Sequence, residues 1–239
     1  MIQPQIFSDH ETMSRRAADW LCERLRQRPD ALISLAAGST PARLYELLAE
    51  RGRAEPSLVA RCRFIKLDEW GGLARDDPAT CEHQLRRLLI DPLGVGDRYT
   101  AFQSRPDDPA AECARIAARL QANGPIDVAV LGLGLNGHIG FNEPADSLQP
   151  HAHVAKLSVE SMQHVMLSAS SDRPHYGVTL GMADLLQARE ILLLASGPTK
   201  REPLRRQLTG ELTTLFPASF LHLHPRVTLF CDEAACPQR

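Results

Sequence analysis

The stretch from Ile126 to Leu148, IDVAVLGLGLNGHIGFNEPADSL, joins an apolar run to polar side chains that could do acid–base chemistry. An unbroken apolar run is typical of a parallel strand that is covered on both faces. Asn136, His138, Asn142 and Glu143 follow it. Ligands of open α/β sheets bind at the carboxyl ends of such strands. We therefore expect this strand to deliver these side chains into a ligand site.

His138 and Glu143 could form an acid–base pair. An imidazole gives and takes protons near neutral pH. A carboxylate that faces the imidazole fixes its tautomer and raises its basicity. The alternative is a loop histidine that makes one backbone hydrogen bond.

Two other stretches have the composition of an anion site. Gly38, Ser39 and Thr40 form a small-residue turn after an apolar strand, and Thr40 is expected to cap a helix that starts at Pro41. A helix N-terminus offers N–H groups and partial positive charge to a phosphate. Lys200 is expected in the first turn of another helix, where a cation is unfavourable unless an anion binds nearby. A plain capped helix and an ordinary surface lysine are the alternatives.

Asp68 and Glu69 directly follow an apolar strand at residues 63–67. A carboxylate held beside apolar walls can be tuned to act as a general base. A pair of solvated loop acids is the alternative.

Strands and helices alternate along the chain, which predicts an α/β fold: a three-layer αβα, Rossmann-like arrangement with a mostly parallel open sheet. Without repeats or linkers, residues 1–239 are expected to form a single domain. Ser8 and Glu11 have the spacing of a capping box. Strands are expected at 31–37, 63–67, from 126, 154–157, 191–195 and 226–231, and helices from Ser8–Asp9 to near Pro29, from Pro41, from Asp77 to before Pro92, from Asp108, within 176–186 after a turn, and after Lys200.

The bulk composition excludes several classes of protein. The chain has 239 residues, 44% hydrophobic residues, 23% charged residues and a net charge of −2, without a basic block, so nucleic acid is not an expected partner. No apolar run is long enough for a membrane span, and the first residues lack the pattern of a secretory signal. Six cysteines are scattered without a C-x-x-C pair, which favours reduced thiols and a cytoplasmic location.

Neither a metal nor an organic cofactor is expected. The close histidine pairs, His151–His153 and His222–His224, lack a nearby cysteine or paired carboxylate with zinc spacing. Gly132, Gly134 and Gly137 spell G-x-G-x-x-G after a strand, but Pro144 interrupts the helix that a dinucleotide site needs. A G-x-S-x-G nucleophile elbow is also missing.

Together these stretches resemble the aminosugar-phosphate deaminase/isomerase family, which includes glucosamine-6-phosphate and galactosamine-6-phosphate deaminases. GHIGFNEP is the most specific block. In 6-phosphogluconolactonases of the same superfamily, the stretch after the Gly-x-x-Gly-His segment differs. DEWGGL, DPATCE and LQPHAHVAKLS look more similar to the galactosamine-6-phosphate group. The matching stretches are residues 35–48, 66–73, 131–148, 176–200 and 217–235.

The resemblance implies a role for each matching residue. Asp68 would be the base that moves a proton between C2 and C1 of the open-chain sugar. His138 would open the pyranose ring, with Glu143 as its charged partner and Asn136 beside it. The products would be ammonia and a ketohexose 6-phosphate, from galactosamine 6-phosphate or glucosamine 6-phosphate. The remaining positions expected at the sugar phosphate are Gly38, Ser39, Thr40, Glu69, Gly137 and Lys200.

Asn136 is a departure from the family pattern, because the glucosamine enzymes have Asp at this position. Asn keeps a hydrogen-bonding group but removes a charge, so a protonated His138 would depend mainly on Glu143. We interpret this change as tuning of the site and not as loss of activity.

Two further departures concern anion binding. Residues 159–164 lack the Arg that binds phosphate in the family, so Lys200 and the backbone N–H groups of the glycine turn would do more of the binding, with Arg43 or His164 as candidate helpers. Residues 149–153 lack the basic residues of an allosteric site, so no such activation is expected. The competing hypotheses are a 6-phosphogluconolactonase and a non-catalytic sugar-phosphate sensor. A homo-oligomer is compatible with the sequence.

Overall fold

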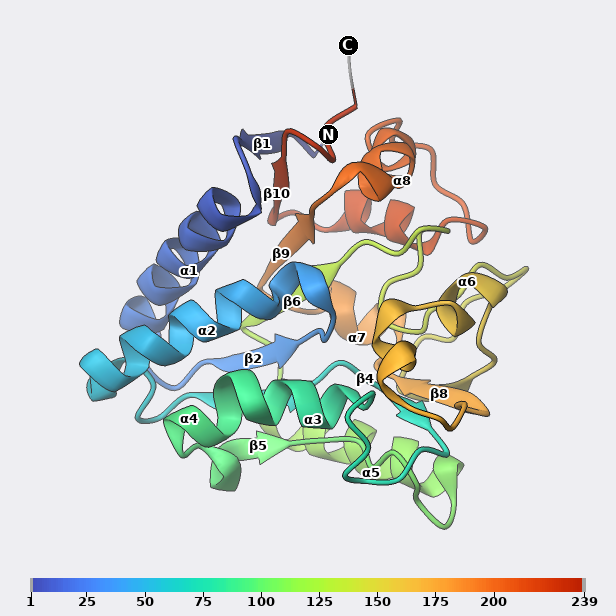
Figure 1. Cartoon of the computed structure of the whole chain (residues 1–239), viewed down its shortest axis with the longest axis horizontal. Helices are drawn as coiled ribbons and strands as arrows, with labels where there is room; N and C mark the ends of the chain where they lie inside the picture. Colours follow the sequence, from blue (N-terminus) through green and yellow to red (C-terminus); the bar gives the residue numbers. More distant parts are fainter. Residues whose placement is uncertain (1, 238–239) are drawn as a thin grey trace.

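The computed structural model describes residues 2–237. Within these residues, seven strands form a parallel sheet in the order β1-β10-β9-β6-β2-β3-β5, and three more form a small antiparallel sheet in the order β4-β8-β7 (Figure 1). The strands are β1 (Pro4–Phe7), β2 (Leu32–Leu35), β3 (Arg63–Lys66), β4 (Asp68–Gly71), β5 (Tyr99–Thr100), β6 (Val128–Gly132), β7 (His153–Ala155), β8 (Tyr176–Thr179), β9 (Glu190–Ala195) and β10 (Val227–Asp232).

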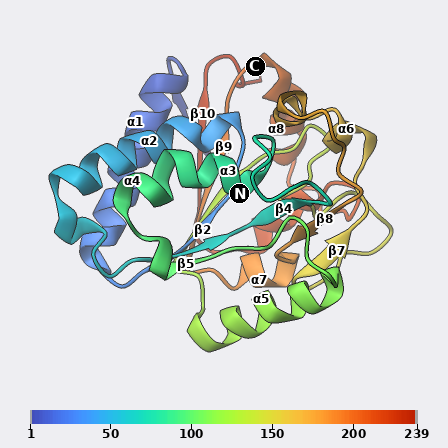
Figure 2. The same cartoon turned by 60° about the horizontal axis from the view of Figure 1, so that its bottom comes forward.

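Helices cover both faces of the parallel sheet, as the alternation of elements predicts. Figure 2 shows α5 and α7 on the opposite side of this sheet from α1 and α2. The helices are α1 (His10–Gln27), α2 (Ser39–Ala54), α3 (Cys81–Leu85), α4 (Asp91–Leu93), α5 (Pro109–Asn123), α6 (Val159–Met162), α7 (Met182–Leu186) and α8 (Arg201–Gln207), with shorter turns at Pro56–Leu58, Gly96–Arg98, Val165–Ala169, Pro198–Lys200 and Pro217–Leu223.

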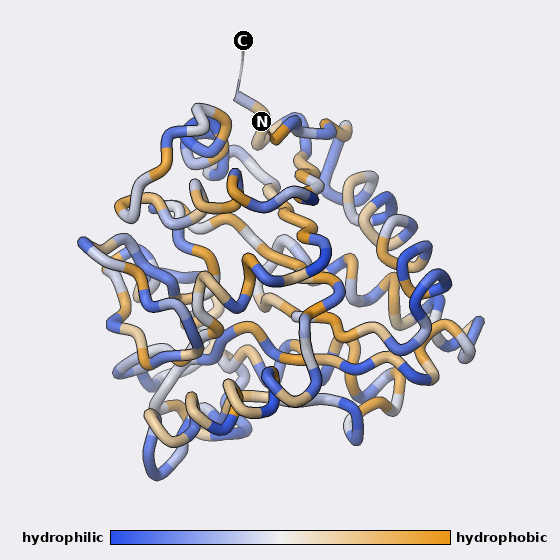
Figure 3. Tube along the Cα trace, turned by 180° about the vertical axis from the view of Figure 1, so that it is seen from behind, coloured by the Kyte–Doolittle hydropathy of each residue, from blue (hydrophilic) through white to orange (hydrophobic). Residues whose placement is uncertain are grey.

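The core against the parallel sheet consists of two layers, because successive strand residues point to opposite faces of the sheet. Val128 and Val130 of β6 pack with α1 and α2, whereas Ala129 and Leu131 pack with α5 and α7. All four side chains are buried, and hydropathic colouring of the trace places the most apolar segments inside (Figure 3). The three-layer architecture predicted from the sequence is confirmed.

The polar ends of the helices differ from the sequence predictions. Asp9, not Ser8, caps α1 by accepting the Thr12 N–H at 2.7 Å. Glu11 pairs instead with arginines of α1 and α2. Helix α2 begins before Thr40, because Gly38 makes the turn with φ +114° and leaves Ser39 already helical.

The helix expected from Asp77 to before Pro92 begins and ends later. Asp77 makes a turn by accepting the Ala79 N–H, and Thr80 caps α3. A π-helical segment, Arg86–Ile90, then connects α3 to α4. The helical run passes Pro92 and ends at Gly94, which has φ +63°.

Some strands lie outside the predicted set. The edge strands β1 and β5 are short and take their register from β10 and β3. Tyr176–Thr179, expected as part of a turn and helix, is strand β8, and the strand expected at 154–157 is β7 at His153–Ala155. Asp68–Gly71 pairs with β8. The chain therefore passes from the parallel sheet to the small sheet between Lys66 and Asp68.

Candidate active site

A cavity of about 370 Å³ opens at the carboxyl ends of β2, β6 and β9. These three strands are neighbours in the parallel sheet. The connection from β2 leads to β3 on one side, and that from β6 leads towards β9 on the other, so the cavity lies at a topological switch point, where α/β proteins bind ligands. The small sheet and the segment after β7 complete its walls, which comprise residues 36–41, 67–70, 132–141, 160–166 and 199–200 in part.

The turn between β2 and α2 presents two free backbone donors to the cavity. Gly38 is fixed by Gln84, whose side chain accepts the Gly38 N–H at 2.7 Å and donates to its carbonyl at 3.2 Å. In a helix, the first N–H groups lack intrahelical partners. Because Gly38 is engaged and Pro41 has no N–H, Ser39 and Thr40 supply the donors at this end of α2.

A second glycine turn lies at the end of β9. Gly197 has φ +88°, and its N–H donates to Asp232 at 3.0 Å. Ser196 Oγ also donates to Asp232, at the end of β10. The buried carboxylate therefore holds the turn that brings Thr199 and Lys200 to the cavity wall.

Lys200 is the cation at this wall. Its ammonium makes no ion pair or side-chain hydrogen bond within residues 2–237, and burial lowers its pKa. Arg43, considered from the sequence as a helper, is held outside the cavity by Glu11, Glu46 and Glu50.

His164 lies on the cavity wall near Lys200. Burial, followed by the charges of His138 and Lys200, lowers the pKa of His164 to about 4, so its ring is neutral at pH 7. The Met166 N–H donates to Nδ1 at 3.3 Å. The proton of the neutral ring is therefore on Nε2, which can donate to an anion.

Asp68 is a half-buried carboxylate on the cavity wall. Burial, together with the charge of Glu69, raises its pKa to about 7, although Lys66 opposes this shift. Its Oδ1 atom has no hydrogen-bond partner within residues 2–237. A carboxylate with these properties suits proton abstraction near neutral pH.

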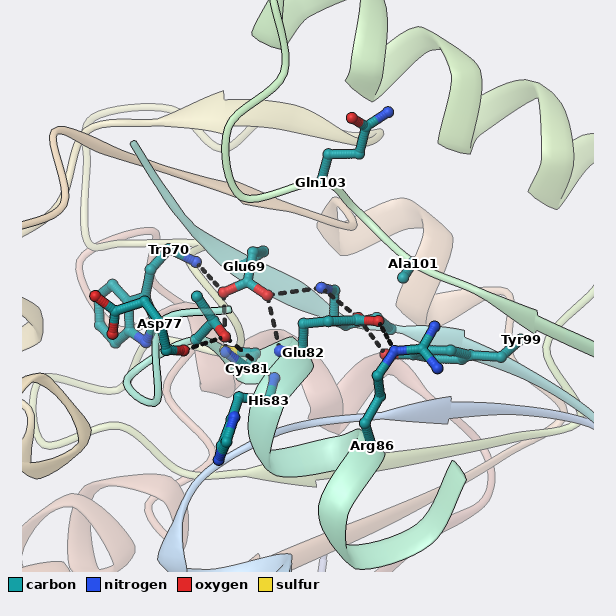
Figure 4. Close-up of polar contacts among 12 residues, drawn as sticks. Glu69, Trp70, Asp77, Cys81, Glu82, His83, Arg86, Tyr99, Ala101 and Gln103 are labelled. Carbon is teal, nitrogen blue, oxygen red and sulfur yellow. Dashed lines mark hydrogen bonds and ion pairs between the residues drawn. The ribbon is translucent and has the colours of Figure 1, made fainter. Parts of the chain in front are cut away.

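Glu69 lies behind this wall and does not line the cavity, contrary to the expected substrate contact. It is fully buried, and its oxygens accept the backbone N–H groups of Trp70, Cys81 and Glu82 at 2.8–2.9 Å (Figure 4). Its side chain thereby caps α3, and Lys66 Nζ binds it at 2.6 Å. These contacts use both carboxylate oxygens, so Glu69 stabilises the structure next to Asp68 and does not bind the ligand.

The cluster around Lys66 extends away from the cavity. The buried ammonium also binds Glu82 at 2.9 Å. Glu82 in turn accepts a hydrogen bond from the Tyr99 hydroxyl at 3.0 Å and forms an ion pair with Arg86 Nε at 2.7 Å (Figure 4). The cations Lys66 and Arg86 balance the charges of the carboxylates in this cluster, so pairing compensates the free-energy cost of burying the charges.

His138 and Glu143 are brought together, as their spacing suggests. Glu143 Oε2 lies 3.5 Å from His138 Nδ1, and Asn136 Nδ2 donates to the same oxygen at 3.0 Å. Burial alone would raise the pKa of Glu143, but bonds from His138, Ser161 and Asn136 lower it to about 2. Glu143 is therefore a carboxylate at neutral pH. His138 and Ser161 of this group line the cavity, whereas Glu143 and Asn136 do not.

Asn136 and Gly137 shape the loop that carries His138. Asn136 Oδ1 accepts the His138 N–H at 3.1 Å. Gly137 is buried with φ +86°, and a Cβ atom there would lie 2.1 Å from the Phe216 ring. Gly137 thus serves packing and does not line the cavity, in contrast to the expected substrate contact.

Several site residues lie outside the predicted set. Ser161 contacts both His138 and Glu143, and Gln84 and Asp232 fix the two glycine turns. Trp70 packs on Phe141 and His164 at the cavity wall. None of these residues has a local sequence signal, because each acts on a partner more than 15 residues away in the chain.

Between residues 2 and 237, no group of three or more His, Cys, Asp or Glu side chains is arranged to hold a metal ion. Over the same residues, no helix is long and apolar enough to cross a membrane.

Comparison with known proteins identifies the family of this chain and agrees with its fold. The family model described as glucosamine-6-phosphate isomerases/6-phosphogluconolactonase matches residues 8–230. This chain therefore belongs to the glucosamine-6-phosphate isomerase/6-phosphogluconolactonase family. It is 40% identical to "Putative deaminase AgaI" of Escherichia coli (strain K12), over 92% of this chain and 88% of that protein.

Other relatives are glucosamine-6-phosphate deaminases. One from Bacillus velezensis is 35% identical, over 95% of each chain. A solved monomeric glucosamine-6-phosphate deaminase superposes with a TM-score of 0.92 at 32% identity, over 98% of each chain. The 6-phosphogluconolactonase of Trypanosoma brucei superposes with a TM-score of 0.79 at 20% identity, which shows a shared fold alone.

Proposed function

We propose that this protein is a deaminase that isomerises a hexosamine 6-phosphate to a ketohexose 6-phosphate and releases ammonia. The curated relatives named as deaminases cover nearly the whole chain. The observation that carries the proposal is one cavity lined by Asp68, His138 and Lys200. It combines a base, an acid and a free cation, which is what this reaction needs.

The first step is ring opening. His138 donates a proton to the ring oxygen while the C1–O5 bond breaks, and it then accepts the proton that the C1 hydroxyl loses as the aldehyde forms. The neighbours of Nδ1 are the carboxylate Glu143 and the hydroxyl of Ser161. The carboxylate stabilises the charged imidazolium, and both of these groups face Nδ1 and leave Nε2 free. The proton exchanged with the sugar is therefore carried by Nε2.

The second step is proton transfer. Asp68 takes the proton from C2 while His138 returns a proton to O1, which gives a 1,2-enolamine. Asp68 then gives its proton to C1, which leaves a C1 hydroxyl and a 2-iminium ion. Water then adds to the imine carbon, and ammonia leaves as the ketone forms. Because the pKa of Asp68 is about 7, the carboxylate can both accept and return a proton near neutral pH.

The phosphate anchors the reacting end of the sugar. Lys200 supplies a positive charge, the Ser39 and Thr40 N–H groups supply donors at the start of α2, and His164 supplies an Nε2–H. Together they replace the arginine that the family places in the segment around residues 159–164. An anchor of this kind lowers the entropic barrier by fixing the sugar before reaction.

Galactosamine 6-phosphate, giving tagatose 6-phosphate, is the proposed substrate, with glucosamine 6-phosphate as the alternative. The stretches DEWGGL, DPATCE and LQPHAHVAKLS support this preference. A side-by-side assay of ammonia release from the two sugars tests it. A higher kcat/KM with glucosamine 6-phosphate would reverse the preference, and no ammonia from either would refute the deaminase.

The same preparation should be assayed for hydrolysis of 6-phosphogluconolactone. Lactone hydrolysis without ammonia release would identify a lactonase. Binding of sugar phosphates without turnover would identify a sensor. A cytoplasmic location and a homo-oligomer stay predictions for this chain, and one solved relative is described as monomeric.

A further inference from the structure

The hydroxyl of Ser161 lies between the two members of the His138–Glu143 pair. Ser161 is 1% exposed and comes from α6, in a different part of the chain. Its Oγ donates to Glu143 Oε1 and lies 3.4 Å from His138 Nδ1. The direct distance from Nδ1 to Glu143 Oε2 is 3.5 Å, so Ser161 approaches the imidazole as closely as the carboxylate does.

The direction of each hydrogen bond follows from the chemistry of the groups. Glu143 is ionised, because the bonds that it accepts hold its pKa at about 2, and a carboxylate can only accept. The Ser161 proton must therefore point to Glu143. Its oxygen is then left to accept, and the nearby Nδ1 can only be a donor to it.

The segment that carries Ser161 is anchored at the same place. Ser158 caps α6 by accepting the Ser161 N–H at 3.1 Å, and its own N–H donates to Glu143 at 3.3 Å. Asn136 Nδ2 donates to Ser158 Oγ at 3.2 Å. The residues that follow, including His164, form a wall of the cavity.

We infer that Ser161 is a positioning residue, which holds His138 in the Nδ1–H tautomer and ties that tautomer to the placement of the cavity wall formed by residues 160–166. The role in turnover rests on the proposed function, whereas the tautomer is a property of the protein alone. In the Nδ1–H tautomer, Nε2 is free to exchange protons with a ligand. Loss of the hydroxyl leaves Nδ1 with only the long contact to Glu143.

Ring-nitrogen NMR of ¹⁵N-histidine-labelled, ligand-free protein tests the inference without a substrate. The wild type should show His138 with a protonated Nδ1 at a pH where the ring is neutral. Ser161→Ala should show a mixture of tautomers, and Ser161→Thr should restore the wild-type signature. An identical His138 signature in the wild type and Ser161→Ala would overturn the inference.

Kinetics provides the second readout. Ser161→Ala should lower kcat about 10-fold, as expected for loss of a residue that orients a functional histidine, with a smaller change in KM. Ser161→Thr should recover kcat, and Ser168→Ala, an exposed serine near the same wall, serves as the control. A kcat of Ser161→Ala equal to that of the wild type at every pH would also contradict the positioning role of Ser161.

The two proposals fail in different ways. If the wild type releases no ammonia from any hexosamine 6-phosphate, the proposed function fails, but the tautomer comparison still tests Ser161. If Ser161→Ala does not fold, Ser161→Cys keeps the approximate volume and substitutes a weak donor. That variant should shift the tautomer signature towards the mixture, and an unshifted signature would overturn the inference.

Discussion

Asp68 is the residue on which the proposed isomerisation depends. Asp68→Asn keeps the shape of the side chain but removes its basicity. We expect kcat to fall by about 10²- to 10⁴-fold, the usual contribution of a general base, while the sugar phosphate still binds. Turnover is measured by ammonia release, and binding is measured by calorimetry with the ketohexose 6-phosphate product. Unchanged turnover would assign the proton transfer to another group.

Lys200 tests the position of the phosphate. Lys200→Ala should raise KM about 10-fold or more with a smaller change in kcat, because it removes the unpaired cation of the cavity wall. Arg205→Ala is the matched control, since that cation lies on α8 and pairs with Glu202. Equal KM values for both variants would place the phosphate elsewhere in the protein.

The residue types that carry chemistry are visible in the sequence, but their partners are not. The spacing of His138 and Glu143 correctly indicates that they pair. Glu69 cannot be distinguished from Asp68 by sequence, because only the fold turns one towards the cavity and the other towards α3. Ser161 gives no local signal, since its contacts are with residues 18 and 23 positions away.

At the scale of elements, two glycines with positive φ have opposite surroundings. Gly38 has open space where a Cβ would be, whereas a Cβ on Gly137 would overlap the Phe216 ring. Gly38→Ala should therefore lower the unfolding free energy by only about 1–3 kcal/mol, through backbone strain. It should also raise KM, because the turn presents the Ser39 and Thr40 donors.

Gly137→Ala is the contrasting variant. The collision with Phe216 adds overpacking to the backbone strain, so the loss of unfolding free energy should exceed that of Gly38→Ala. Thermal unfolding of both variants beside the wild type checks the order. If Gly137→Ala were the more stable of the two, the packing role assigned to Gly137 would be wrong.

The long elements follow from local pattern, and the short ones do not. Residues 10–27 have clear helical periodicity and the central strands are unbroken apolar runs, and the structure confirms both. β8 reads as a turn before a helix, and β1 is a four-residue edge strand. Such strands take their conformation from partners that lie far away in sequence, so a local window contains no evidence for them.

For the whole molecule, the raised pKa of Asp68 predicts how activity depends on pH. The base must be ionised, so kcat/KM should rise with pH and level off above a midpoint near 7. This rise is measured as a pH profile of the rate at a substrate concentration well below KM, where the rate is proportional to kcat/KM. A rise in kcat/KM with its midpoint near pH 4 would show that the pKa of Asp68 is not raised in the free enzyme.

The same shift predicts a cost in stability. Between about pH 4 and pH 7 the folded protein holds a proton on Asp68 that the unfolded chain has lost, so its unfolding free energy falls as the pH rises. Asp68→Asn removes this dependence. It should be more stable than the wild type by about 4 kcal/mol at pH 8, with the difference fading towards pH 4. Chemical denaturation at the two pH values checks this, and a pH-independent difference would contradict it.

The charged cluster behind Asp68 has a consequence for how this family can change over evolutionary time. Lys66, Glu69 and Glu82 depend on one another, because removing Lys66 leaves Glu69 buried without a counter-charge, and removing either carboxylate leaves Lys66 with one counter-charge in place of two. A single replacement is therefore expected to be counter-selected even though none of the three lines the cavity. Relatives that carry an apolar residue at the position of Lys66 should also have replaced Glu69, so the three positions should be inherited and exchanged together.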